Sequence, residues 1–427
     1  MLSLKQYAKR RVELLLARLV KRKLKRTQPT VIGITGSFGK TSTKEAVYEV
    51  LKTRWRVYRN AKSLNTEIGL LLAVLEQSSG FRSPIKWIKV FSGALWNAFF
   101  SEKHDFLILE YGVDKPGDIQ HLLSIAKPHI SIITHIAAVH QDEGQFKNAE
   151  EVFEEKKKLA TCLEKTDMAI LNDADPFLKK LTGKLKAKTF WFNGLAGNAD
   201  LSADNLKNTA RGFSATLHHA EQKLHAQFPV AGAYHIDVFL PALLCGMLHG
   251  ISLKEGVAAL QNFHLPPGRM SIIEGKQGST LLDSTYNASP ETMKQALQLL
   301  HDFPGKRKKA VLGNMNELGE FSPHGHADIG NHIGVWLDQL IIVGSQAALI
   351  AEQALKNGFP KTRIKILFNA EEAAHALSTN LSKGDVVLLK GSQNKVRLER
   401  AVKLLMAHTE QAKTLLCRQE HEWQHYE

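Results

Sequence analysis

The spacing of apolar residues along the chain changes at Pro29. Before Pro29, apolar residues recur at roughly helical intervals, with lysines and arginines between them. After it, short apolar runs alternate with longer amphipathic stretches, which is typical of parallel β-α-β units in a wound sheet. The pattern predicts a basic amphipathic helix and linker over residues 1–29, followed by an α/β protein.

The apolar runs after Pro29 form two groups, separated by a turn at Pro266-Pro267-Gly268. The first group predicts strands at 30–35, 106–110 and 130–135 and a helix at 41–53. The second group predicts a Rossmann-like domain with strands at 280–283, 310–313, 339–344, 364–367 and 385–390. We therefore expect a central domain over 30–265 with a wound parallel sheet and a C-terminal domain over 266–427.

Residues 79–104 interrupt this alternation with a segment rich in aromatic residues. Their aromatic side chains are interleaved with lysines: Trp87, Phe91, Trp96, Phe99 and Phe100 with Lys86, Lys89 and Lys103. We favour packing of these aromatics in the core, and contact with a membrane or a partner is the alternative. The same two interpretations apply to the basic helix, which either packs on the body or lies on an anionic membrane surface.

A glycine-rich segment between the first predicted strand and helix has the context of a phosphate-binding loop. Gly36 and Gly39 allow the tight turn that points backbone N–H groups at phosphate oxygens, and the helix N-terminus favours an anion. Lys40 can reach the β- and γ-phosphates of ATP, and the Thr41 hydroxyl can bind Mg²⁺. The pattern GxxxxGK[ST] is not met, because Ile34 stands at its first glycine. The expected nucleotide-binding residues are Thr35, Gly36, Ser37, Phe38, Gly39, Lys40, Thr41 and Ser42.

Three further residues are candidates for metal binding or catalysis. Glu110 ends an apolar strand, so its carboxylate is expected at the ligand-binding edge of the sheet, where an oxygen ligand suits Mg²⁺. His140 follows the next strand. Lys156 belongs to a run of three lysines on a helix that begins near Ala149. Composition alone does not single out one lysine of this run.

The formal net charge of +14 favours an anionic partner, either a nucleotide, a nucleic acid or an acidic membrane. Much of the charge is local, because the segment from Lys5 to Arg26 holds ten lysines and arginines and one acid. We find no aromatic-basic nucleic-acid motif, which argues against nucleic acid as the partner. The three cysteines lie far apart, and we find neither a secretory signal nor a membrane-spanning run. A cytoplasmic protein is expected, with the basic helix able to hold it at the inner membrane face.

Several ordered motifs resemble those of the Mur ligase family. They are the loop TGSFGKT, the segment LEYG with Glu110, and THIAAVH, which ends at His140. The segments Pro267–Met270, 283–290, 311–319 and 389–392 resemble the MurF branch, and the resemblance covers about residues 30–400. It implies a central P-loop ATPase domain and a C-terminal Rossmann-like domain. It also implies an ATP-dependent amide ligase of peptidoglycan precursor synthesis, which joins a carboxylate to the amine of an amino acid or dipeptide through an acyl phosphate. The MurF branch joins D-alanyl-D-alanine to a UDP-MurNAc-tripeptide.

The resemblance also implies roles for individual residues. Lys40 and Thr41 would hold the ATP phosphates and Mg²⁺, and Glu110 and His140 match metal-associated positions. Lys156 matches a lysine that relatives carry as a CO₂-derived carbamate, with Lys157 as the neighbouring alternative. The remaining carried-over positions are Asn172 and Asp173 near the nucleotide, Arg269 reaching ATP from the C-terminal domain, and Asp283, Tyr286 and Asn287 in the cleft between domains.

Three departures from the family pattern raise alternatives. The chain is expected to lack the usual N-terminal UDP-binding domain. The family's HNxxN-type segment has lost its asparagines and reads His235-Ile236-Asp237-Val238-Phe239 here. Asn314 stands where an acidic residue is common in the family. One alternative is a Mur-type ligase for a lipid-linked or polymeric carboxylate. Another is a folate- or poly-amino-acid-adding ligase, which the MurF-like motifs disfavour. The third is a catalytically weakened nucleotide-binding scaffold.

Overall fold

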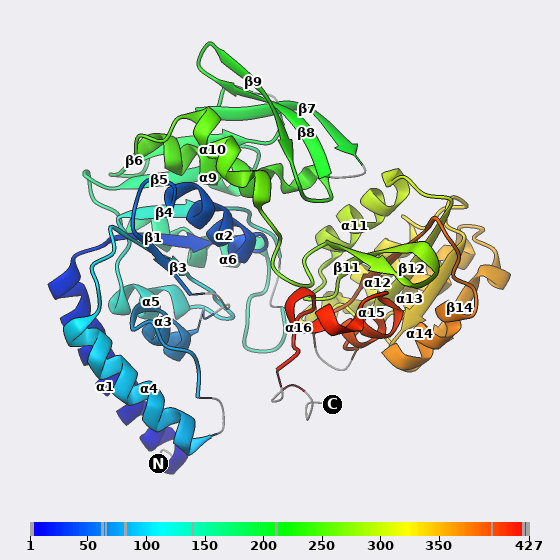
Figure 1. Cartoon of the computed structure of the whole chain (residues 1–427), viewed down its shortest axis with the longest axis horizontal. Coiled ribbons are helices and arrows are strands. Elements are labelled where there is room, and N and C mark those ends of the chain that lie inside the picture. The colour runs from blue at the N-terminus through cyan, green and yellow to red at the C-terminus, as the bar shows by residue number, and fades with distance from the viewer. Residues whose placement is uncertain are drawn as a thin grey trace.

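The computed structural model describes residues 4–60, 64, 66–80, 83–138, 141–195, 197–209, 212–393, 396–420 and 423. Two sheets organise this part of the chain, one in the left part of Figure 1, coloured blue to green, and one in the right part, coloured light green to red. Helices cover both sheets, which confirms the predicted α/β class. The sheets draw their strands from either side of the predicted turn at residues 266–268. The domain bounds themselves stay a prediction.

The first sheet has the strand order β2-β3-β1-β4-β5-β6-β7-β8-β9. Strands β2 to β7 pair in parallel, and β7, β8 and β9 extend the sheet as antiparallel hairpins. The strands are β1 (Thr30–Thr35), β2 (Val57–Arg59), β3 (Phe106–Glu110), β4 (Ile130–Ile133), β5 (Met168–Asn172), β6 (Lys188–Asn193), β7 (Leu201–Thr209), β8 (Gly212–His219) and β9 (Gln222–Phe228).

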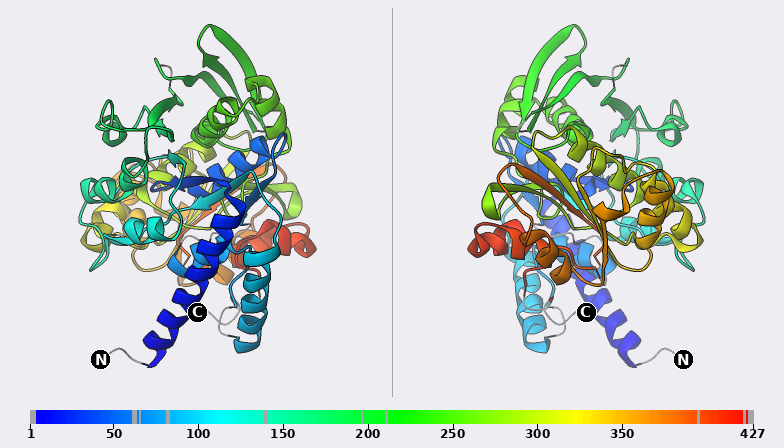
Figure 2. Two further views of the ribbon diagram at one scale, coloured as in Figure 1. Left: turned by 90° about the vertical axis from the view of Figure 1, so that its left-hand side faces the viewer. Right: turned by 90° about the vertical axis from the view of Figure 1, so that its right-hand side faces the viewer.

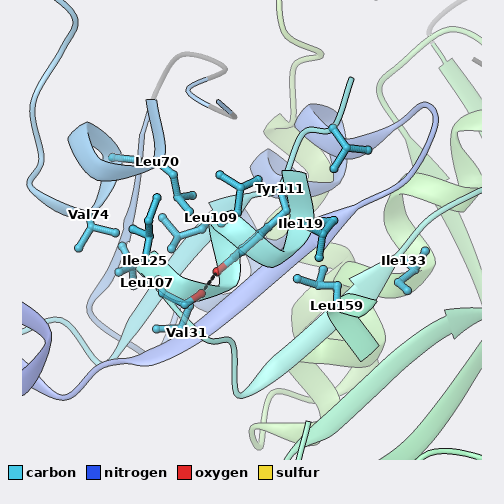
Figure 3. Packing of buried hydrophobic residues seen from close by; sticks show 14 of the residues in the cluster. Val31, Leu70, Val74, Leu107, Leu109, Tyr111, Ile119, Ile125, Ile133 and Leu159 are labelled. Carbon is cyan, nitrogen blue, oxygen red and sulfur yellow. Dashed lines mark hydrogen bonds between the residues drawn. The ribbon is translucent and has the colours of Figure 1, made fainter. Parts of the chain in front are cut away.

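Successive residues of β1 enter two different apolar cores, because side chains of a strand alternate between the faces of its sheet. Val31 packs with Leu107 and Leu109 of β3 in one core, which Figure 3 shows from close by. Ile32 belongs to the core on the opposite face, together with residues of α2 and α9. The covering helices are α2 (Lys40–Leu51), α3 (Glu67–Val74), α5 (Asp118–Ile125), α6 (Ala149–Lys156), α7 (Lys158–Thr161), α8 (Pro176–Lys179), α9 (Ile236–Leu248) and α10 (Leu253–Ala259).

The second sheet has the order β10-β11-β15-β12-β13-β14, parallel except for the antiparallel edge strand β10. Its strands are β10 (Ser271–Gly275), β11 (Ser279–Ser284), β12 (Arg307–Gly313), β13 (Gln339–Val343), β14 (Ile364–Leu367) and β15 (Asp385–Lys390). Its helices are α11 (Pro290–Asp302), α12 (Ser322–Gly330), α13 (Ala348–Lys356), α14 (Ala370–Ser378), α15 (Glu399–Leu405) and α16 (Ala412–Leu415).

The basic N-terminal segment forms α1 (Leu4–Thr27), which lies beside α4 (Pro84–Phe100), the helix formed by the aromatic segment. Leu16 and Val20 of α1 are fully buried against the body, so the expected packing of this helix is confirmed on one face. The aromatics of α4 divide into two groups. Trp87 and Phe91 pack against the core, whereas Trp96 and Phe100 are mostly exposed, so core packing is wrong for them. Among the described residues, no helix is long and apolar enough to span a membrane.

A buried charge cluster ties the start of β15 to β12. The Asp385 carboxylate lies 2.7 Å from Arg307 Nε and 2.9 Å from Lys309 Nζ, and both Asp385 and Lys309 are at most 1% exposed. Burial raises the pKa of Asp385, but the hydrogen bonds from the two basic groups outweigh it and lower the pKa overall. The cluster therefore favours ionised Asp385 in the folded protein.

Replacing Asp385 with alanine is expected to lower the free energy of unfolding by about 3 kcal/mol, because Lys309 would then be buried without its ion pair. The matched control is Glu371→Ala, which removes a surface carboxylate 3.7 Å from Arg400 and should cost less than about 1 kcal/mol. Urea unfolding measures the free energy of unfolding of both variants. Because the pKa of Asp385 is lowered in the folded state, the difference should shrink as pH falls below the ordinary aspartate value of about 4. Equal losses for the two variants at pH 7 would contradict this account.

Candidate active site

The predicted phosphate loop joins the end of β1 to the start of α2. Gly36 has a φ of 149° and Gly39 a φ of 83°, and both values favour glycine. A Cβ on Gly36 would overlap Thr134 Oγ1, and that hydroxyl donates to Phe38 O at 2.6 Å. The loop is therefore held tightly against the end of β4, with the first turn of α2 opening at Lys40.

Replacing Gly36 with alanine is expected to weaken ATP binding at least about tenfold, because the new methyl group displaces Thr134 and with it the loop. Gly183→Ala is the control. Gly183 also has a positive φ, 70°, but a Cβ there meets open space. Calorimetric titration with ATP measures both variants. A Gly36 variant that binds ATP as tightly as the unmodified protein would show that the close contact with Thr134 is unimportant.

Side chains from both halves of the chain converge on the first turn of α2. Glu110, at the end of β3, accepts a hydrogen bond from Thr41 Oγ1 at 3.0 Å, and Arg269 donates to the same hydroxyl at 2.9 Å. The Arg269 guanidinium lies over the Tyr286 ring, 4.0 Å from its centroid. Burial lowers the pKa of Lys40, and the Glu110 carboxylate partly offsets this. The cluster joins a hydroxyl, a carboxylate and two basic groups at the phosphate loop.

The same cluster fits a hard cation. The Thr41 hydroxyl and the 2%-exposed Glu110 carboxylate supply oxygen ligands of the kind Mg²⁺ prefers when it also binds substrate phosphates. In the described part of the chain, no three His, Cys, Asp or Glu side chains gather into a metal site. The fit is therefore to a cation shared with phosphate groups rather than to one enclosed by protein ligands.

One lysine of the run at residues 156–158 is fully buried, and the other two pair with glutamates, Lys157 with the exposed Glu154 and Lys158 with the buried Glu155. Lys157 Nζ lies 2.6 Å from Glu154, and Lys158 Nζ lies 2.6 Å from Glu155. Lys156 is 0% exposed, and its Nζ has no hydrogen-bond partner among the described residues. Burial and the positive charge of Lys40 hold the pKa of Lys156 well below its usual range. The structure therefore distinguishes Lys156 from its neighbours as a buried amine close enough to Lys40 to feel its charge.

A cavity of about 450 Å³ lies between the two halves of the chain. Ten of the predicted site residues line it: Ser37, Phe38, Gly39, Lys40, Thr41, Ser42, Glu110, Arg269, Tyr286 and Asn287. The halves also touch directly beside it, where Gln141 N donates to Glu317 O at 2.8 Å and Gly319 N donates to Asp142 at 3.2 Å. The arrangement encloses a phosphate loop, a carboxylate and basic groups in a space large enough for small-molecule substrates.

Comparison with known proteins gives matches over both halves. Residues 34–246 match the Mur ligase middle domain, and residues 268–393 match the Mur ligase glutamate ligase domain. The UDP-N-acetylmuramoyl-tripeptide–D-alanyl-D-alanine ligase of Synechocystis sp. is 30% identical over 378 residues, 88% of this chain and 74% of that relative. The chain belongs to the Mur ligase family. It is a MurF-like, ATP-dependent amide ligase.

Two further relatives agree with this assignment. The Bacillus subtilis ligase of the same name is 29% identical over 394 residues, which cover 92% of this chain and 79% of that relative. The crystal structure of MurF from Thermotoga maritima in complex with ADP has a TM-score of 0.77 and 27% identity, and covers 94% of this chain and 84% of that one. The Mur ligase fold thus extends over the described sheets.

Several of the predicted site residues do not line the cavity. Thr35 donates to Tyr111 O at 2.8 Å, and Asn172 donates to Thr134 O at 3.0 Å, so both support the phosphate loop from beneath. Asp173 accepts from Asn193. Asp283 accepts from Thr285, and burial raises its pKa to about 6. His140 lies outside the described residues, so its metal role stays a prediction.

The residues of this Mur ligase cavity that were not predicted include three with shifted pKa values: His135, Asp237 and Lys390. His135 stacks on Phe38 with ring centroids 4.7 Å apart. Burial lowers its pKa, but the hydrogen bond with Asp175 raises it overall. Burial raises the pKa of Asp237 to about 6, and burial together with Arg269 lowers the pKa of Lys390 to about 7. His135 and Lys390 end or follow predicted strands, which is the signal that could have found them.

The departure at Asn314 has a local structural role in this Mur ligase. The side chain accepts a hydrogen bond from Ala347 N at 2.8 Å, next to the start of α13. Its backbone oxygen accepts from Ser392 N at 2.9 Å, in the loop after β15. Asn314 therefore joins two loops at the carboxyl edge of the second sheet.

Proposed function

We propose that this MurF-like ligase joins the terminal carboxylate of a UDP-MurNAc-tripeptide to the amino group of D-alanyl-D-alanine, in the cytoplasm, during peptidoglycan precursor synthesis. The names of the Synechocystis and Bacillus relatives support this choice of substrates. The observation that carries the proposal is the contact between Arg269 and Thr41, which brings the second half of the chain onto the phosphate loop.

The proposed reaction has two steps. A carboxylate oxygen of the first substrate attacks the γ-phosphorus of ATP, and the bond to the β-phosphate oxygen breaks, leaving an acyl phosphate and ADP. The incoming amine then attacks the acyl carbon, and phosphate leaves as the amide forms and the amine loses a proton. Lys40 and the loop N–H groups would neutralise negative charge on the transferred phosphoryl group.

The enclosure of the cavity has a role in this scheme. An acyl phosphate reacts readily with water, so it must form where the amine has better access than solvent does. Arg269 and Tyr286 from the second half cover the phosphate loop, and the contacts of Gln141 and Gly319 bring the halves together beside it. We infer that a closed form such as this one carries out the chemistry, with opening needed for substrate entry.

Mg²⁺ would be held by Thr41 and Glu110, with His140 as a further predicted ligand, and its charge would neutralise phosphate oxygens when it is bound. Lys156 would be carried as a carbamate. Its buried, unpartnered amine with a lowered pKa suits the reaction with CO₂, which forms an N–C bond and releases one proton. The product replaces a buried amine with an anionic oxygen ligand, which suits a site for Mg²⁺.

The test measures ADP release with Mg²⁺–ATP, bicarbonate, UDP-MurNAc-tripeptide and D-alanyl-D-alanine, each left out in turn. We expect release to require both substrates and mass spectrometry to find the new amide. ATP binding without stimulation by these substrates would refute the substrate assignment. It would favour the other candidate within the family, a ligase for a lipid-linked or polymeric carboxylate, which the exposed apolar surface beside α1 supports.

A further inference from the structure

Helices α1 and α4 contact each other near the body of the molecule and extend beyond it, and both views of Figure 2 show them spreading apart toward their outer ends. They run in the same direction, because Arg22 lies over the Phe99 ring and Arg26, one turn later, donates to Ser101 O at 2.9 Å. Their inner faces are already packed. Leu16 and Val20 of α1 are 0% exposed, and the small residues of α4 beside them are buried as well. The pair therefore needs no further cover on its inner face.

The outer face of α4 is apolar and open to solvent. Ile85 is 71% exposed, Ile88 69%, Trp96 63% and Phe100 66%. These positions share one side of the helix, because they are separated by three, eight and four residues. An exposed stripe of four large apolar side chains is unusual for a protein surface and marks a contact with an apolar phase or a partner. We call the outer faces of α1 and α4 together the α1–α4 ridge. Its exposed apolar residues are Leu14, Leu15, Ile85, Ile88, Leu95, Trp96, Phe99 and Phe100.

The ridge is also strongly basic. Its exposed basic residues lie on α1 and at the start of α4: Arg10, Arg11, Arg18, Lys21, Arg22, Lys25, Lys86 and Lys89. The two helices contain one acid, Glu13, and that residue is half-buried. The Arg22 guanidinium lies 3.9 Å from the centroid of the Phe99 ring, so the basic and apolar surfaces adjoin each other. The combination of aromatic, aliphatic and basic side chains is that of a helix pair lying in a membrane interface.

We propose that the α1–α4 ridge docks this ligase on an anionic phospholipid surface. The aromatic side chains of α4 enter the headgroup region, and the basic side chains of α1 bind the acidic headgroups. Charge complementarity selects this occupant over a second copy of the chain, whose equally basic ridge would repel it. The exposed apolar side chains favour a phospholipid surface over nucleic acid, because nucleic acid would need only the basic side chains that bind phosphate.

Docking is tested by sedimentation with vesicles of phosphatidylcholine alone or with about one third phosphatidylglycerol. The unmodified protein is expected to bind the anionic vesicles, to bind neutral vesicles weakly, and to lose affinity as salt screens the headgroups. Failure to bind anionic vesicles would overturn the proposal, and so would equal binding to both kinds. The outcome is independent of the substrates used in the ligase assay.

Substitutions on the α1–α4 ridge test whether this ridge is the surface that binds the vesicles. Trp96→Ser with Phe100→Ser should weaken vesicle binding at least about tenfold, since two apolar side chains that would enter the membrane are lost. Arg18→Gln and Lys21→Gln should each weaken it about fivefold. Matched controls lie on other elements: Phe368→Ser replaces an aromatic that is 91% exposed, and Lys207→Gln removes an exposed lysine of β7. Equal losses for ridge and control variants would overturn the assignment to this ridge.

Two further measurements check that the variants fold and test whether the ridge is instead an interface between two copies of the chain. Thermal unfolding checks that the ridge variants fold, and their expected melting temperatures equal those of the controls because the replaced side chains are exposed. Sedimentation velocity tests the second-copy alternative. A dimer that Trp96→Ser with Phe100→Ser dissociates, together with no vesicle binding, would show that the ridge is an interface between copies and would refute membrane docking.

Discussion

Replacement of Lys40 with alanine is expected to reduce substrate-dependent ADP release at least about a thousandfold. Lys40 stands at the first position of α2, where its Nζ lies 2.7 Å from Gly36 O and close to the charge of Glu110. A lysine there can meet the γ-phosphate and neutralise charge that develops during its transfer, and removing such a group costs a large part of the rate. The measurement is steady-state ADP release under saturating ATP.

The matched control is Lys52→Ala, which removes an exposed lysine at the other end of the same helix. That variant should keep the unmodified rate, because Lys52 pairs with Glu49 far from the phosphate loop. A Lys40 variant with unchanged turnover would show that Lys40 has no part in phosphoryl transfer. An unmodified protein that binds ATP but never turns it over would support the nucleotide-binding scaffold instead of the ligase.

Replacement of Lys156 with alanine is expected to lower the ligase rate at least about a hundredfold, although Lys156 does not line the cavity. If Lys156 is carried as a carbamate, the variant loses an anionic oxygen ligand near Lys40. Lys157→Ala is the matched control, because that neighbour pairs with Glu154 at the surface and should not affect the rate. Initial rates in buffer with and without bicarbonate measure the effect.

Carbamylation makes two additional outcomes measurable. Removing bicarbonate and CO₂ should slow the unmodified protein and leave Lys156→Ala unaffected. A small carboxylate such as formate or acetate should partly restore Lys156→Ala, since it can supply the missing oxygens. Equal rates for Lys156→Ala and Lys157→Ala, or a bicarbonate effect that persists in the Lys156 variant, would refute the carbamate at this position.

Replacing Lys156 is expected to affect stability and activity in opposite directions. The ligase rate falls, but the free energy of unfolding of the uncarbamylated protein rises. The folded state holds the amine with a lowered pKa, whereas the unfolded chain binds a proton up to about pH 10. Folding therefore releases a proton at pH values between the folded-state and unfolded-state pKa of Lys156, and the uncarbamylated protein becomes more stable as pH rises toward the unfolded-state value. In bicarbonate-free buffer, Lys156→Met should be more stable than the unmodified protein at pH 7, because it buries an apolar group in place of an amine.

The sequence predicts several strands that are buried along most of their length, such as β1, β3 and β15. It also predicts the partly exposed edge strand β14, and it misses the buried strand β5. Strands β1, β3, β14 and β15 have the predicted bounds, and other predicted strands differ by a few residues at their ends. Continuous apolar runs bounded by turn residues determine such strands locally. The hairpins β7 to β9 were not predicted. Residues 201–209 mix polar and charged side chains, because this extension of the sheet is solvent-exposed along much of β7.

The phosphate loop was also determined by local sequence, because its function depends on consecutive backbone groups and on Lys40 and Thr41 next to them. Contacts between residues far apart in the sequence were not determined by local sequence. Parallel strands of the first sheet place Ile34 opposite Glu110, and this register brings the carboxylate to Thr41, 69 residues away along the chain. The family resemblance supplied Glu110 and Arg269 as candidates, but only the folded arrangement puts both on one hydroxyl.

The choice among Lys156, Lys157 and Lys158 shows most directly what the sequence alone cannot predict. The three are identical in composition and adjacent in sequence, and only their directions on the helix differ. Tertiary packing buries Lys156 without a hydrogen-bond partner among the described residues. It leaves Lys157 and Lys158 partly exposed and paired with Glu154 and Glu155. The same holds for α4, where packing buries Ala94 and Ala98 and leaves Trp96 and Phe100 exposed. The sequence by itself predicts several of the strands, the phosphate loop and the family. Burial, which decides which amine can react and which aromatics face solvent, depends on all the neighbours that the fold brings together.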